Sequence, residues 1–492
     1  MELRRIASAQ LRPLLLLLVA AAIVGAAWSL IVPAWQAPDE HSHFGYAQTL
    51  AEQGEPPASE GDRRYSTEQE QAADAIGADQ LAANLFARPE WSEAEYERWR
   101  RLQAAEGEAA RADGDGAGPE GSNSARTNPP LYYAFEAIPY HAASATDLFG
   151  RLYLMRLWSA LLVLVAAAAT WAFVGELLGP RRGLQLAGAA VVALQPMAVF
   201  VSASINPDAM LIPAFATTLW LGVRVIRRGL TVGNGAALCA AAAVAILAKA
   251  TGYALLPGVF LALAIGGYRA AGGLRVGSLV KRSALPLLAL AVPVGAWLAY
   301  ARLSDRPAVN QVGAGGGGDF DHAGLFSYLW QFYLPQAPGQ MPLPPGYPSL
   351  PARDFWIEGF WGKFGWLEIV WPDPLYLAVG LLTAAAIVGA GVALVRSGLR
   401  RHAAEAAFLV LVALSLLGGL HLTEYRILAD QNTVFNQGRY LLPLLPLLAA
   451  AVAAALSLAK GQVQQALVGA LVGFLFVLQV VSLAIVGARF YA

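Results

Sequence analysis

Long apolar runs constrain this chain of 492 residues more than any other feature of its sequence. Most are about 20 residues long, which is enough for a helix to cross a hydrocarbon core of about 30 Å. A membrane barrel would instead alternate apolar and polar residues in segments of about 10. The sequence therefore predicts an all-α, polytopic membrane protein with about 11 transmembrane helices. The runs lie near residues 12–32, 153–178, 184–203, 209–226, 233–248, 251–267, 283–302, 375–395, 403–423, 440–458 and 463–487.

Composition agrees with this class and bounds the partners. Hydrophobic residues make up 57% of the chain and charged residues 14%, whereas charged residues make up about 25% of a typical soluble protein. The formal net charge is zero, so a nucleic-acid partner has no support. Cys239 is the single cysteine, which excludes an intrachain disulfide. The lipid bilayer is the first partner that the sequence predicts.

Basic residues gather in every second connection between the apolar runs. By the positive-inside rule these connections are cytoplasmic, together with the N-terminus. An odd number of spans then places the last residues, "GARFYA", outside. The basic groups are Arg4, Arg5 and Arg12; Arg181 and Arg182; Arg224, Arg227 and Arg228; Arg269, Arg275, Lys281 and Arg282; Arg396, Arg400 and Arg401; and Lys460.

This topology divides the chain into five segments. The first run is longer than the 7–15-residue core of a signal peptide, so we expect a retained anchor and not a cleaved leader. We expect the first transmembrane helix at 1–32, an extracytoplasmic loop with an acidic motif at 33–150, helices two to seven at 151–302, a second large extracytoplasmic loop at 303–373 and helices eight to eleven at 374–492.

The two large loops have distinct compositions. The first carries 21 acidic residues against 8 basic ones. Its residues 66–112 are expected to form short amphipathic helices at the membrane surface, because "STEQEQ" and "SEAEYERW" are helix-start patterns. Residues 104–127 and the Gly-rich residues 312–321 are expected to be flexible, either as linkers or as lids over a site.

Ionisable and polar residues collect at the outer ends of the predicted spans. Charges there are costly enough to indicate either function or an anchoring role. Taken singly, each has an ordinary explanation: a snorkelling lysine, an interfacial arginine or a helix-capping Asp or Asn. Their convergence on one face favours function. They are Asp39 and Glu40 after the first span, Asn206 and Asp208 in "SASINPDAM", Lys249 in "AILAKATGYALLP" and Arg439 in "FNQGRYLLPLLP".

Two further features leave alternatives open. A metal site made from Asp39, His41 and His43 is one interpretation, but the two histidines do not share a helix face, so we predict no metal-ligating residues. The stretch 354–376 holds four Trp and is either an interfacial aromatic belt or a platform for a sugar ring or a lipid head.

Several of these segments together resemble a known superfamily. "PDEHSHFGYAQTL" resembles the acidic first-loop signature of the GT-C superfamily, polytopic glycosyltransferases that take sugars from polyprenyl-phosphate carriers, and "NPPLYYAF" is similar to the Pro-Pro-aromatic segment later in that loop. Together with "FWGKFGW" and "NQGRYLLPLLP", the chain resembles a related bacterial membrane family of unknown function. The resemblance covers about residues 30–450 and implies a GT-C-like fold in a bacterial plasma membrane, with an extracytoplasmic active site.

The resemblance also implies roles for individual residues. Asp39 corresponds to the catalytic carboxylate, with Glu40 as its neighbour in the acidic pair, and Asn128 stands where related enzymes often carry His. A divalent cation is used by some members of the superfamily and not by others, so its need is left open. The residues expected to bind substrate are His43, Asn206, Asp208, Lys249, Trp361, Gln437 and Arg439, of which Lys249 and Arg439 serve the carrier phosphate.

The chemistry of glycosyl transfer agrees with these roles. A base must take the proton of the acceptor hydroxyl, and cations must stabilise the departing phosphate. Attack by a single base-activated acceptor predicts inversion at the anomeric carbon. The sequence therefore favours transfer of a sugar from a polyprenyl-phosphate donor to a glycan or lipid acceptor of the cell envelope. The alternative is a transporter or flippase of a lipid-linked saccharide, which would need polar residues along a path through the membrane.

Overall fold

The computed structural model describes residues 2–57, 65–84, 86–88, 97, 99–101, 104, 111, 123–273, 276–306, 321–340, 342–344 and 347–492. The long helices are α1 (Glu2–Ile31), α8 (Leu148–Leu178), α9 (Arg182–Leu194), α11 (Asp208–Arg228), α12 (Val232–Ala248), α13 (Leu256–Ala271), α14 (Val276–Leu303), α18 (Asp373–Ser397), α19 (Ala403–Gln431), α20 (Leu445–Leu456) and α21 (Gly461–Tyr491).

Shorter elements connect and cover these helices. They are α2 (Glu40–Gln53), α3 (Thr67–Ala75), α4 (Ala78–Ala83), η1 (Ser124–Thr127), α7 (Leu131–Ala142), α10 (Pro196–Ser202), η2 (Ala250–Leu255), α15 (His322–Tyr333), α16 (Pro351–Arg353), η3 (Asp354–Gly359), α17 (Phe360–Gly362), β1 (Lys363–Phe364), β2 (Ile369–Val370), η4 (Leu399–His402) and η5 (Gly438–Leu444). The two strands pair as an antiparallel hairpin, Lys363 with Val370 and Phe364 with Ile369.

All of the predicted apolar runs are helical, which confirms an all-α polytopic membrane protein. Within the described ranges, 9 helices are long and apolar enough to cross a membrane, or up to 10 if the bent pair α9 and α10 is one span. The remaining run, α12, is an apolar helix of 17 residues. The expected number of about 11 spans is therefore reached only if α12 and the bent pair also cross.

The bend between α9 and α10 has a local cause. Pro196 is the first residue of α10 and cannot donate the backbone hydrogen bond that would continue α9. The side chain of Gln195 caps the new helix, since its Oε1 accepts from the amide of Ala198, while its Nε2 donates to the carbonyl of Phe360. The two axes differ in direction by 56°. The Gln195 side chain at this break therefore links the centre of the bundle to the segment before the hairpin.

Small residues allow close packing in the bundle core. Helix α9 lies against α8 and α20, and half of its buried residues are Ala or Gly. A Cβ added at Gly188 would approach a methyl carbon of Val174 on α8 to 2.7 Å. Such small residues are typical of helix interfaces in membranes. The hydrophobic effect does not hold helices together in lipid, so close approach of the backbones and the van der Waals contact it allows stabilise the interface.

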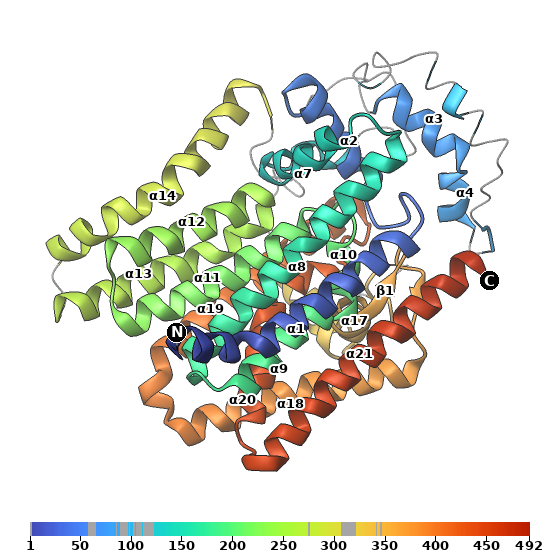
Figure 1. Ribbon diagram of the computed structural model, residues 1–492. Helices are drawn as coiled ribbons and strands as arrows, with labels where there is room; N and C mark the ends of the chain where they lie inside the picture. The colour runs from blue at the N-terminus through green and yellow to red at the C-terminus, as the bar shows by residue number, and fades with distance from the viewer. Residues whose placement is uncertain are drawn as a thin grey trace.

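The short helices α2, α3, α4 and α7 cover one end of the bundle (Figure 1). The C-terminal end of α21 lies there too, because Arg489 donates to the carbonyls of Leu81 and Ala87 and the Tyr491 hydroxyl donates to the carbonyl of Ile31. The second large loop meets the first at the same end, where Arg306 donates to the carbonyl of Pro56. Both large loops therefore face one side.

The predicted helix start at "STEQEQ" is confirmed. The hydroxyl of Ser66 accepts from the amide of Gln69 and caps α3. The second start signal, "SEAEYERW", lies largely outside the described residues, as do most of 104–122 and of the Gly-rich residues 312–321.

Candidate functional site

The first turn of α2 places Asp39 at a strained backbone position. Asp39 is the residue before the helix and has φ 61°, in the left-handed region that costs energy for a residue with a Cβ. Its carbonyl accepts from the amide of His43 at 3.0 Å. Trp35, in the turn that leads there from α1, also has a positive φ of 57°. Backbone strain of this kind is concentrated at functional sites, where the surrounding structure maintains it.

An ion pair holds the Asp39 carboxylate. Arg439 at the start of η5 donates one bond to Asp39 and a second, of 3.2 Å, to the carbonyl of Pro38. Burial would raise the pKa of Asp39, but Arg439, His43 and Lys249 together lower it well below its ordinary value. Asp39 is therefore ionised at neutral pH.

A second ion pair lies beside the first. Lys249, between α12 and η2, donates to Asp208 at 2.7 Å. Asn206 positions this carboxylate, because its side chain accepts from the amide of Asp208 at 3.0 Å. The cations Lys249 and Arg439 both lie over the ring of Tyr440, at 5.1 and 5.5 Å from its centroid. The predicted carboxylates and cations thus meet around one tyrosine.

A hydrogen-bonded chain fixes the imidazole of His43. Nδ2 of Asn128 donates to the hydroxyl of Tyr133 at 2.9 Å, and that hydroxyl lies 2.9 Å from Nδ1 of His43. Since Tyr133 already accepts from Asn128, we assign its proton to His43 Nδ1, which leaves the ring proton on Nε2. Burial lowers the pKa of His43 to about 3, so the ring is neutral at physiological pH. Tyr46 stacks on Tyr133 with centroids 3.6 Å apart.

These groups line one cavity of about 470 Å³. Asp39, His43, Lys249 and Arg439, all predicted from the sequence, border the same space. Residues of α19 form the opposite wall, and α19 is long and apolar enough to span a membrane. The other lining residues are Ser124, Ala125, Asn128, Ala250, Thr251, Tyr253, Ala254, Ser415, Leu416, Gly419, Leu420, Thr423, Phe435 and Tyr440. We call this space the charged cavity.

An apolar cavity of about 640 Å³ lies close by, between α7, α12 and α14. Leu247 lines it and precedes Lys249 by two residues, while Pro130 lines it and follows Asn128 by two residues. Its other lining residues are mostly apolar: Leu50, Gly54, Glu55, Pro56, Leu131, Ala134, Pro293, Trp297, Tyr300 and Ser304. A mostly apolar cavity thus lies next to the cavity that holds two cations.

Glu40 lies away from the charged cavity. Both its side chain and that of Arg156 on α8 are fully buried and form an ion pair, with Arg156 Nε donating to Glu40 at 2.7 Å. Glu40 also accepts from the backbone amides of Trp35 and Ile205, at 3.1 Å each. The carboxylate that follows Asp39 in the sequence therefore fastens the first loop to α8 and to the turn before α11.

Four predicted substrate-binding residues do not line the charged cavity: Asn206, Asp208, Trp361 and Gln437. Trp361 on α17 is buried in the bundle core, and its indole N–H donates to the hydroxyl of Thr383 at 3.1 Å. Gln437 precedes η5, and Gly438 beside it packs against Gly359 with no room for a side chain. Asn206 is also absent from the lining and acts through Asp208.

The described residues do not form a site for a divalent cation. They contain no group of three or more His, Cys, Asp and Glu side chains that could hold a metal ion. The carboxylates of Asp39 and Asp208 are each bonded to a cationic side chain, and His41 and His43 line different cavities.

Two aromatic residues of the site escaped the sequence analysis. Tyr133 links Asn128 to His43, and Tyr440 lies under both cations. Each stands within a segment that resembles a family motif, "NPPLYYAF" or "NQGRYLLPLLP". Periodicity cannot tell which of several adjacent tyrosines faces a cavity.

This arrangement of helices is shared with a class of solved membrane proteins. The apo oligosaccharyltransferase of Archaeoglobus fulgidus superposes with a TM-score of 0.51 at 11% identity, over 96% of this chain and 56% of that one. The likeness confirms the GT-C-like fold. The chain belongs to the family of predicted membrane proteins DUF2142, whose model matches residues 22–448.

Two other solved structures are also similar to this chain. ArnT from Cupriavidus metallidurans in the apo state has a TM-score of 0.48 at 14% identity, over 91% of this chain and 60% of that one. AglB from Archaeoglobus fulgidus, in complex with an inhibitory peptide and a dolichol-phosphate, has a TM-score of 0.49 at 12% identity, over 97% and 55%. The chain therefore spans a little over half the length of these proteins. The sequence matches no curated protein.

Proposed function

We propose that this protein is a glycosyltransferase that moves a sugar from a polyprenyl-phosphate donor to a hydroxyl of a glycan or lipid acceptor of the cell envelope, on the extracytoplasmic face of a bacterial plasma membrane. One observation carries the proposal: a cavity with a carboxylate and two cations lies beside an apolar cavity between membrane-type helices. A lipid-linked phosphate has this division between an anionic head and an apolar chain. The fold, shared with an oligosaccharyltransferase, is compatible with it.

The phosphate of the donor is assigned to Arg439 and Lys249. A guanidinium offers parallel donors that match phosphate oxygens, and an ammonium adds a compact charge. Both cations lie over the ring of Tyr440, which limits their movement. The isoprenoid chain would extend towards the apolar cavity bordered by Leu131 and Leu247.

Asp39 is assigned as the general base. While paired with Arg439 it is ionised but weakly basic, because its pKa is lowered. A donor phosphate competes for Arg439, and weakening of the ion pair raises the pKa of this buried carboxylate. Donor binding thus makes Asp39 more basic. Asp39 therefore accepts protons poorly in the free protein and more readily in the complex with the donor.

The transfer step then balances as a single displacement. The acceptor oxygen forms a bond to the anomeric carbon, its proton passes to Asp39, and the bond between that carbon and the phosphate oxygen breaks. The polyprenyl phosphate leaves with its negative charge facing Arg439 and Lys249. Attack opposite the leaving group inverts the anomeric carbon. Glu40 and Asn206 hold Asp39 and Asp208 in place without touching substrate.

The distribution of these residues disfavours the flippase. A flippase needs polar groups along a path through the bundle, whereas Asp39, His43, Lys249 and Arg439 gather in a single cavity at the end of α2. A flippase would also retain its function when Asp39 loses only its basicity.

The experiment measures transfer in proteoliposomes. Radiolabelled short-chain polyprenyl-phosphate sugars serve as donors, and the envelope glycan and lipid fraction of cells that lack this protein serves as acceptor. Asp39→Asn should reduce transfer by roughly 10²–10⁴-fold, the range typical of lost acid–base catalysis. The control is Asp373→Asn, whose carboxylate is 85% exposed and lies outside the cavity. Undiminished transfer by Asp39→Asn would overturn the proposal.

A further inference from the structure

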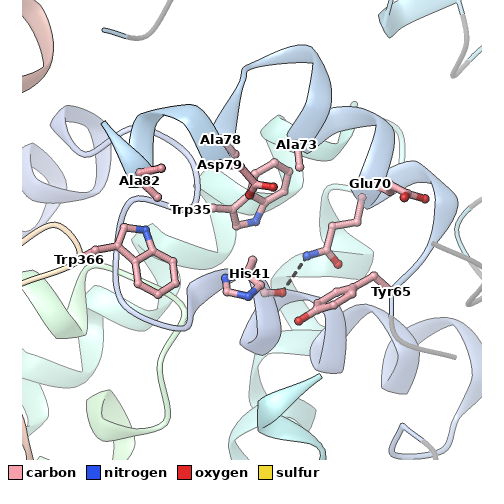
Figure 2. A pocket seen from close by; sticks show the side chains of 11 residues that line it. Trp35, His41, Tyr65, Glu70, Ala73, Ala78, Asp79, Ala82 and Trp366 are labelled. Atoms are coloured by element: carbon pink, nitrogen blue, oxygen red, sulfur yellow. Dashed lines mark hydrogen bonds between the residues drawn. The ribbon is translucent and has the colours of Figure 1, made fainter. Parts of the chain in front are cut away.

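A second cavity, of about 480 Å³, lies on the other side of α2. His41 and His43 are two residues apart and therefore point to opposite sides of the helix, and His41 borders this second space while His43 borders the charged cavity. Figure 2 shows the second cavity, which we call the aromatic cavity. It is lined by the turn before α2, by α3 and α4, and by Trp366 of the hairpin turn. Both large loops thus contribute to it.

Aromatic rings form much of its wall. Trp366 and Tyr65 flank His41, and Trp35 lies above it in this view (Figure 2). The ring centroids of Trp366 and Tyr65 lie 5.6 and 5.8 Å from that of His41. Such rings present flat apolar faces with polar edges. The carbon-bound hydrogens of a pyranose ring form a matching apolar face.

Three buried polar atoms of the lining residues have no hydrogen-bond partner among the described residues: Nε1 of Trp35, Nε1 of Trp366 and Oε1 of Gln69. Trp35 and Gln69 are 2% and 3% exposed. The amide group of Gln69 is held in place because its Nε2 donates to the carbonyl of His41 at 2.8 Å, the dashed line in Figure 2. Buried polar groups are normally paired. Two N–H donors and one acceptor of the lining residues are thus unpaired, and hydroxyl groups, which donate and accept, are the ligand groups that match them.

The charges of the cavity select among such ligands. Among the described residues that line it, Glu70 and Asp79 are acidic and none is Lys or Arg. An anionic head would be repelled there, in contrast to the charged cavity with Lys249 and Arg439. A neutral or amine-bearing ligand is favoured.

We propose that the aromatic cavity is a saccharide-binding site for a neutral or amine-bearing sugar, separate from the cavity that takes the donor phosphate. The binding itself follows from the wall described above. Its role rests on the proposed function: Asp39 stands at the start of the helix that separates the two cavities, so a glycan bound here is placed as the acceptor.

The test uses the full chain in neutral-lipid nanodiscs on a printed array of microbial glycans with neutral, amine-bearing and acidic members. We expect wild type to bind neutral or amine-bearing glycans, and Trp366→Ala to lose at least about tenfold in affinity. Trp330→Ala is the matched control, since Trp330 is a half-exposed tryptophan outside the cavity. Ala82→Trp fills the cavity from α4 without removing any contact and should also abolish binding.

Three results would overturn the proposal: no neutral or amine-bearing glycan bound, binding unchanged in both Trp366→Ala and Ala82→Trp, or a preference for acidic glycans. The array contains no donor, so Asp39→Asn should bind glycans as wild type does while losing transfer. Loss of transfer in Asp39→Asn without glycan binding would remove this inference alone. Glycan binding with undiminished transfer in Asp39→Asn would remove the proposed catalytic role alone.

Discussion

Arg439 donates to the carboxylate of Asp39 and to the carbonyl of Pro38, and so joins the first turn of α2 to the start of η5, 400 residues later in the chain. The same guanidinium lies over Tyr440, together with Lys249. The proposed base is thus held by the proposed phosphate ligand. Loss of either partner changes both the stability of the protein and the basicity of the other.

The ion pair predicts a stability cost that a second substitution should reduce. Arg439→Gln leaves Asp39 charged and largely buried, so we expect a loss of roughly 1–3 kcal/mol, less than for a fully buried pair because Asp39 is 32% exposed. Asp39→Asn/Arg439→Gln removes both charges and should recover much of this loss. Thermal unfolding of the detergent-purified variants measures both. A double variant less stable than Arg439→Gln would show that the pair is not what holds η5 to α2.

His43 predicts an acid-dependent stability. Its pKa is lowered from 6.5 to about 3 by burial, so between these values the unfolded chain binds a proton that the folded protein does not. The contribution of neutral His43 to the free energy of unfolding is therefore fully present above about pH 6.5. It is lost as the pH falls towards 3, by at most about 1.4 kcal/mol per pH unit. His43→Gln should flatten this dependence. His141→Gln, at an exposed position on α7, should leave it unchanged.

The sequence predicted the helices and the main site residues for identifiable reasons. Runs of about 20 apolar residues leave few alternatives to membrane helices. Charge asymmetry placed Asp39, Lys249 and Arg439 at the same ends of their spans, and helices that end on one face bring such groups together. Their common cavity confirms that these side chains lie close to one another.

Pairings within the site could not be predicted in the same way. Glu40 and Asp39 are adjacent in sequence, yet only the fold decides that Glu40 meets Arg156, which lies inside an apolar run. The register of the hairpin decides which Trp of 354–376 borders a cavity. Trp366 is turned towards His41, whereas Trp361 stays in the core. Register is a tertiary property that composition does not encode.

Glu40 predicts a structural effect distinct from that of its neighbour. Glu40→Gln leaves the fully buried Arg156 without its counter-charge, and we expect a loss of about 3–5 kcal/mol. The matched control is Glu97→Gln, which breaks an exposed pair with Arg101 and should cost about 0–1 kcal/mol. Equal unfolding temperatures for the two variants would contradict the anchoring role of Glu40.

The orientation in the membrane predicts which introduced cysteines are accessible from outside. Ser144 and Ser349 are exposed in the two large loops, and Ser397 is exposed at the end of α18 beside the basic connection. An impermeant maleimide added to intact cells should label Ser144→Cys and Ser349→Cys but not Ser397→Cys. The buried Cys239 should give little background. Labelling of Ser397→Cys alone would reverse the orientation and place the charged cavity on the cytoplasmic side.

The central claim, that Arg439 and Lys249 bind a carrier phosphate, is tested most directly by the dissociation constant of a short-chain polyprenyl phosphate for charge-balanced variants. Asp39→Asn/Arg439→Met and Asp208→Asn/Lys249→Met each remove one cation together with its paired carboxylate, so a weaker affinity cannot come from an exposed negative charge. A charge-assisted hydrogen bond is worth about 1.5–3 kcal/mol, and we therefore expect each variant to bind at least about tenfold more weakly than wild type. Dissociation constants equal to that of wild type in both variants would contradict the account.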